Sequence, residues 1–193
     1  MATTATPNGA EPVNTLSASG SYSGKVRHMK IANAYGTAIF YGDFVKPVAA
    51  GGVELDAGTA TLTPIGIFVG CSYTDPTSNQ LTFSQYYPAS TAADDISAYV
   101  VDDPDLVFKI QADATLAQTT MFLNAGAVQT AGSTDFGRSK NALDASTAAT
   151  TATLPLRIVE FVEGPTSAVG DAFTDVLCIY NAGDHAYRNS TGV

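Results

Sequence analysis

The stretch PIGIFVGCSYTDPTSNQLTFSQYYP, residues 64–88, decides the fold. Its first half has apolar side chains at every second position, at Ile65, Ile67, Val69, Cys71 and Tyr73, and this period of two is typical of a β-strand. Turn-forming residues follow at 75–79, and alternation resumes at Leu81, Phe83, Gln85 and Tyr87. Pro64 and Pro88 bracket the stretch, as expected for residues that strand interiors exclude. We therefore predict a β-hairpin with a loop of about six residues.

Composition supports an all-β protein around this hairpin. The chain has 193 residues, 45% of them hydrophobic, so it can bury a sizeable core. Only 14% are charged, against about 25% in an average soluble protein. Short apolar runs separated by glycine, aspartate and proline recur along the chain, and no long helical period is visible. The pattern predicts an antiparallel sandwich or barrel-like body with long loops and an extended N-terminal arm.

We divide the chain into a flexible arm, residues 1–25, and a β-rich body, residues 26–193. Within the body the run 176–180 is apolar on both faces, which predicts a central strand covered on each side. Residues 112–120 could form one short helix. The segment 132–153 is rich in small polar residues, and we interpret it as a long loop that is either a mobile flap or a contact surface. The body could comprise two subdomains.

The arm and the residues that follow it, up to about residue 30, carry the candidate contact residues. The arm is built from small residues that cannot offset the entropy of ordering, so alone it should be flexible. This region of a strongly acidic protein contains three spaced apolar side chains and three cations: Val13, Leu16, Tyr22, Lys25, Arg27 and Lys30. A solvated tail is one interpretation. The other is a docking arm that orders on a partner or on an adjacent copy.

Charge and hydropathy exclude several function classes. The formal net charge of −9 argues against nucleic acid as a partner, because phosphate contacts need clustered lysine and arginine. No run approaches the ~20 apolar residues of a membrane span, so we expect no membrane association. The N-terminus has no secretory signal pattern. Cys71 and Cys178 lie in apolar runs, and we interpret them as buried free thiols rather than a disulfide.

Catalytic and metal-binding motifs are not visible in the sequence. His28 and His185 are too far apart for a local metal motif. Five carboxylates cluster within residues 94–105, but their spacing does not fit a calcium loop, and we assign them to turns. No acid/base pair stands out, and aromatic residues at 83–87 could line a sugar-binding face or belong to a core or subunit contact. We therefore expect no enzyme activity, cofactor or metal.

Six segments of the chain carry a further pattern: ANAYGTAIFYGDFVKP (32–47), IGIFVGCSYTD (65–75), FSQYYP (83–88), VVDDPDLVFKIQAD (100–113), GSTDFGRSKNALDASTAATTATLPLRIVEFVEGP (132–165) and GDAFTDVLCIYNAGDHAYRNSTGV (170–193). In this order and spacing they resemble head-decoration, or cement, proteins of tailed bacteriophages. Together they cover most of the chain after the arm.

The resemblance implies a structural virion protein that is made in the host cytoplasm and binds the capsid exterior. Its partners would be the major capsid protein and itself, as a homotrimer, and its role would be to stabilise the expanded head. The alternative is a tail or fibre component with a carbohydrate-binding surface. An enzyme such as a glycan hydrolase is the third class considered.

Overall fold

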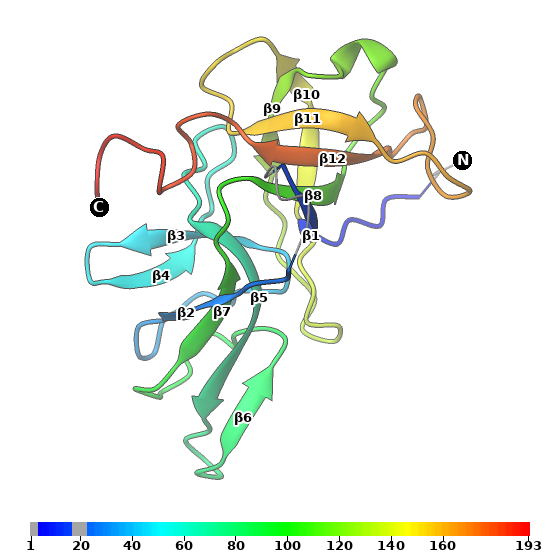
Figure 1. Cartoon of the computed structure of the whole chain (residues 1–193). Helices are drawn as coiled ribbons and strands as arrows, with labels where there is room; N and C mark the ends of the chain where they lie inside the picture. Colours follow the sequence, from blue (N-terminus) through cyan, green and yellow to red (C-terminus); the bar gives the residue numbers. More distant parts are fainter. Residues whose placement is uncertain (1–3, 17–22) are drawn as a thin grey trace.

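The computed structural model describes residues 4–16 and 23–193, and it is nearly all β (Figure 1). One short 3-10 helix, η1 (Gln118–Thr120), interrupts the strands. The twelve strands in these described residues are β1 (Glu11–Thr15), β2 (Arg27–Lys30), β3 (Phe44–Val48), β4 (Gly52–Leu55), β5 (Gly66–Thr74), β6 (Leu81–Ser84), β7 (Ser97–Val101), β8 (Leu106–Gln111), β9 (Asn124–Val128), β10 (Ala142–Ala149), β11 (Leu156–Phe161) and β12 (Asp175–Tyr180).

Two antiparallel sheets pack as a sandwich, which confirms the predicted fold class. The first sheet has the order β1-β8-β12-β11-β9-β10. The second has the order β2-β7-β5-β3-β4, and β6 pairs with the far end of β5. As predicted, β12 is central, between β8 and β11, but only one of its faces is fully buried, because its side chains alternate between buried and half-buried.

The predicted hairpin is confirmed as β5 and β6, with residues 75–80 as its loop. The Asp75 carboxylate accepts hydrogen bonds from the backbone N–H groups of Thr77 and Ser78, at 2.8 and 2.9 Å. These bonds hold the pKa of Asp75 below its usual range. The loop is therefore closed by side-chain-to-backbone hydrogen bonds of Asp75, as expected for the turn-forming residues predicted here.

The predicted side-chain faces of β5 are wrong at one point, because a bulge interrupts the strand. The register against β7 shifts between Phe68 and Gly70, and Gly70 has φ +145°, a conformation that glycine favours. Because of the extra residue, the side chains in the second half of the strand alternate in the opposite sense and point to the opposite face of the sheet. Ile67 therefore packs with the core between the sheets, whereas Cys71 joins Phe68 in a second core.

Two hydrophobic cores result, and β5 contributes to both. The larger lies between the sheets and is centred on aromatic contacts of Phe44, Phe108 and Tyr180, with ring centroids 5.3–6.4 Å apart. The smaller lies on the other face of the second sheet, under the segments that carry Ile39 and Tyr87. Both cysteines are buried and free, one in each core, as the sequence predicts.

Three sequence interpretations need correction. Residues 11–15, assigned to the flexible arm, form β1 and pair with β8, and the preceding Ala10 is fully buried in the larger core. Residues 142–149, assigned to a loop, form β10, because their backbone pairs antiparallel with β9, with an irregular register between Asp144 and Ala149. The expected helix over residues 112–120 is reduced to the three residues of η1.

Candidate functional site

The predicted contact residues separate onto two sheet edges. Val13 lies in β1, at one edge of the first sheet, and Leu16 is the residue directly after this strand. Their side chains are 46% and 55% exposed. Arg27 and Lys30 lie in β2, at an edge of the second sheet, and Lys25 precedes it as an exposed residue. Tyr22 lies outside the described residues.

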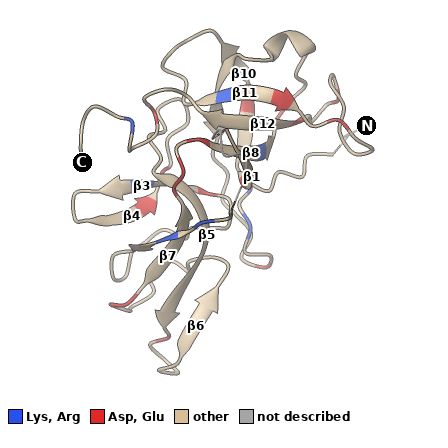
Figure 2. Ribbon diagram, in the orientation of Figure 1, with Lys and Arg blue, Asp and Glu red and all other residues tan. Residues whose placement is uncertain are grey.

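The loop 102–105 between β7 and β8 connects these two edges. The backbone N–H of Leu16 donates to the Asp105 carbonyl at 2.8 Å, and the Thr15 hydroxyl donates to the Asp103 carboxylate at 3.2 Å. Arg27 Nε donates to Asp102 Oδ2 at 2.5 Å. Figure 2 shows the acidic residues of this loop in red. The loop therefore holds both ends of the chain segment that joins β1 to β2.

The same loop also binds the C-terminal segment. The Tyr187 hydroxyl donates to Asp102 Oδ2 at 2.6 Å, and Arg188 forms an ion pair with Asp105. Burial and the bond to the Asp102 carboxylate raise the pKa of Tyr187 to about 12. The Asp102 side chain is only 8% exposed, so its carboxylate is a shared acceptor inside the protein. The sequence indicated turns here, but it gave no signal that this loop binds both the end of β1 and the C-terminal segment.

Arg27, one of the predicted contact residues, already has partners within the chain. Its guanidinium already forms an ion pair with Asp102 and lies over the Tyr187 ring, 5.9 Å from the centroid. Lys25, Arg27 and Lys30 are all exposed at this edge, and of the three Arg27 is the one with an ion pair to Asp102. A partner at β2 would therefore meet two lysines beside an arginine that is already paired.

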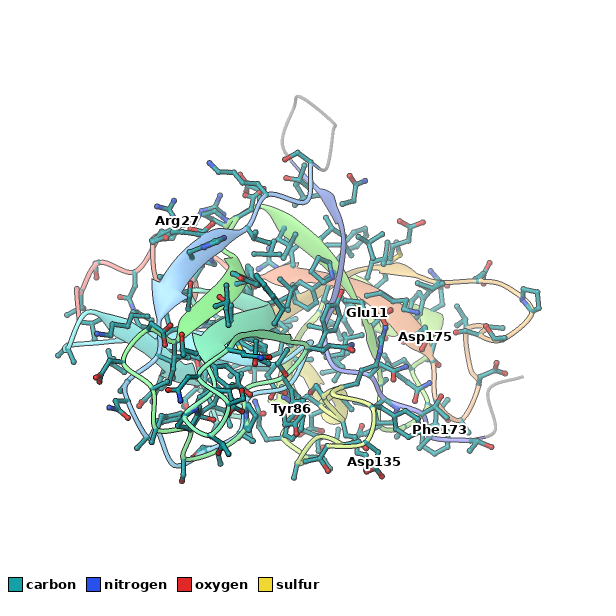
Figure 3. The ribbon with its side chains drawn as sticks, turned by 90° about the horizontal axis from the view of Figure 1, so that it is seen from below. Glu11, Arg27, Tyr86, Asp135, Phe173 and Asp175 are labelled. Carbon is teal, nitrogen blue, oxygen red and sulfur yellow. The ribbon has the colours of Figure 1, made fainter. Side chains whose placement is uncertain are left out.

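A polar cleft of about 450 Å³ lies where the N-terminal segment crosses the first sheet. Figure 3 shows Glu11 and Asp175 on this side of the molecule. The lining of the polar cleft is rich in hydroxyl, amide and charged groups: Thr4, Thr6, Asn8, Glu11, Lys109, Gln111, Thr166 and Asp175. Such a lining can exchange hydrogen bonds with a polyhydroxylated ligand.

The charged groups of this polar cleft are already paired. The Glu11 carboxylate bridges Arg138, at 2.7 Å, and Lys109, at 3.3 Å. Gln111 accepts a hydrogen bond from the Thr6 backbone N–H and donates one to Asp175. The Glu11 carboxylate is therefore engaged in ion pairs with two cations.

A third surface is the exposed side of β6. Leu81 and Phe83 are 60% and 69% exposed, and they project from the same side of the strand. Their cross-strand neighbours on β5 are Thr74 and Ser72, which leave the apolar side chains uncovered. The β5–β6 hairpin extends away from the rest of the molecule (Figure 1). Sequence alternation identified these residues as a strand but did not show that this face is open.

Within residues 4–16 and 23–193, no group of three or more His, Cys, Asp or Glu side chains is placed to hold a metal ion. In the same part of the chain, no helix has the length and apolar character needed to cross a membrane. No protein-family model, curated protein or solved structure matches the chain.

Proposed function

We propose that this chain is a structural, non-catalytic virion protein that binds the outer surface of a tailed-phage capsid and stabilises the expanded head. The proposal joins the family resemblance of the sequence to the β-sandwich fold. In this role the protein acts as a homotrimer, its partner is the major capsid protein, and it needs no cofactor.

The observation that carries the proposal is the exposed apolar pair Val13 and Leu16 beside edge strand β1. Fully burying a side chain of this kind stabilises an interface by about 1.5–3 kcal/mol. Exposed ion pairs from Lys25 and Lys30 would add about 0–1 kcal/mol each. Repeated copies on a shell would multiply such modest contacts into firm attachment.

The structure changes how this docking surface would work. Because β1 is a strand of the sandwich, Val13 and Leu16 would be presented on a fixed edge rather than on a free arm. Less ordering entropy is then lost when the partner binds. The contact would use side chains that are already in position.

A sedimentation assay with expanded capsids that lack the protein tests the proposal. Wild-type protein should co-sediment with the capsids and raise their resistance to heat. The double variant Val13→Ser/Leu16→Ser should bind at least tenfold more weakly. Phe122→Ser, at a side chain that is 67% exposed elsewhere on the surface, is the matched control and should bind normally. Absence of wild-type binding would overturn the proposal.

The polar cleft supports a second candidate, a tail or fibre component that binds carbohydrate. Its hydroxyl and amide lining resembles what sugar recognition needs, although its charges are paired internally. Binding to a panel of host glycans, lost in Asn8→Ala and retained in Phe122→Ser, would favour this candidate. Capsid binding without glycan binding would reject it.

A further inference from the structure

Edge strands expose unpaired backbone groups, and natural proteins protect them with proline, charge or bulges. Four of the edge strands in the described chain follow this rule. β1 contains Pro12, β2 contains Arg27 and Lys30, β4 contains Glu54, and β10 contains Asp144. β1 and β10 also have irregular registers with their neighbours.

Strand β6 lacks each of these protections. Its sequence, LTFS, has no charge and no proline, and its register with β5 is regular. It pairs only with β5 in the described chain, so its other edge is open. It also carries the exposed Leu81 and Phe83.

The surrounding segment is free of charge as well. Residues 76–93 contain no Asp, Glu, Lys, Arg or His, although the chain as a whole has a net charge of −9. Two copies of such an acidic protein repel each other over most of their surfaces. At this segment they can approach without bringing like charges together.

We propose that β6 pairs antiparallel with β6 of a second copy across a two-fold axis. A second copy is the occupant that fits, because β6 is the unprotected edge among the described strands and an isologous contact matches each edge with an identical one. The contact is independent of the proposed capsid role, and as a two-fold contact it would be additional to the three-fold contacts of the proposed homotrimer. It also uses a different surface from Val13 and Leu16, so it does not compete with that docking surface.

The backbone geometry fixes the register of this pairing. Asp75 N donates to the Gln80 carbonyl at 2.9 Å, so Gln80 and, two residues on, Thr82 direct their backbone groups toward β5. Leu81 and Phe83 consequently direct theirs toward the open edge. With Thr82 on the two-fold axis, Leu81 of each copy lies opposite Phe83 of the other and exchanges backbone hydrogen bonds with it. All four apolar side chains then share one face.

This register predicts a specific disulfide cross-link. Thr82 would face its own symmetry mate in a non-hydrogen-bonded pair, where Cα atoms are about 4.5 Å apart, a distance that a disulfide spans. Gln80 would be displaced from its mate by four residues, about 13 Å along the strand, which is too far. The native Cys71 and Cys178 are buried and should not compete.

Single-cysteine additions to the full chain test the proposal. Under mild oxidation Thr82→Cys should yield a covalent dimer on a non-reducing gel, at least tenfold more than Gln80→Cys. In sedimentation equilibrium the wild-type particle should double in mass as concentration rises. Leu81→Lys should weaken this association at least tenfold, and Phe122→Lys should leave it unchanged.

Either of two results would overturn the proposal. The first is a wild-type mass that stays constant up to millimolar concentration, which does not depend on the folding of any variant. The second is equal cross-linking of Thr82→Cys and Gln80→Cys, which would indicate random collision. Capsid binding plays no part in either readout, so failure here is distinguishable from failure of the proposed function.

Discussion

Asp43 and His185 are buried titratable groups whose effects on stability should oppose each other between pH 7 and pH 4. Asp43 is 4% exposed, and burial raises the pKa of its carboxyl to about 6. His185 is fully buried, and burial lowers the pKa of its imidazole to about 4. Its Nδ1 also accepts a hydrogen bond from the Tyr187 backbone N–H, which protonation would break.

The two signs follow from proton linkage. Asp43 has a pKa in the folded state above the unfolded value of 3.8, so the free energy of unfolding increases as pH falls from 7 toward 4. His185 has a folded-state pKa below the unfolded value of 6.5, so the free energy of unfolding decreases over the same range. At about 1.4 kcal/mol per pKa unit, each contribution reaches about 2–3 kcal/mol by pH 4. Their sum should be close to zero.

Two substitutions separate the effects. Asp43→Asn removes the increase in the free energy of unfolding that the Asp43 carboxyl contributes on acidification. Between pH 7 and pH 4 the free energy of unfolding of this variant should therefore fall by about 2–3 kcal/mol relative to wild type. His185→Gln removes the decrease that the His185 imidazole contributes. Over the same pH range the free energy of unfolding of this variant should rise by a similar amount relative to wild type. Urea unfolding followed by circular dichroism at a series of pH values measures both. If the two variants showed the same pH dependence as wild type, the assigned pKa shifts would be wrong.

Two further predictions concern the loop 102–105 and strand β1. A double-mutant cycle between Asp102→Ala and Tyr187→Phe should give a coupling energy of about 1.5–3 kcal/mol in urea unfolding, because the Tyr187 hydroxyl donates to a buried carboxylate. A coupling energy near zero would contradict the role of Asp102 as a shared acceptor. Deleting residues 2–16 should lower the melting temperature of the body, since β1, Ala10 and the Glu11 ion pairs are lost, and an unchanged melting temperature would show that β1 is dispensable.

The sequence alone determined the fold class and the hairpin. Alternating apolar residues and the turn residues at 75–79 are local signals, because strand periodicity and turn chemistry act over a few neighbouring residues. The same is true of the buried cysteines, whose apolar neighbours indicated burial. These features needed no knowledge of which strands meet.

Tertiary structure decided the features that depend on distant partners. Residues 11–15 have the composition of a flexible arm, and they form a strand because β8 offers backbone groups and the core has room for Ala10. The bulge before Gly70 arises from pairing with β7, which the alternation of β5 does not encode. Asp102 joins strand β2 to the C-terminal segment because Arg27 and Tyr187 approach it from 75 and 85 residues away in sequence. Contacts of that separation are set by packing, and local patterns carry no information about them.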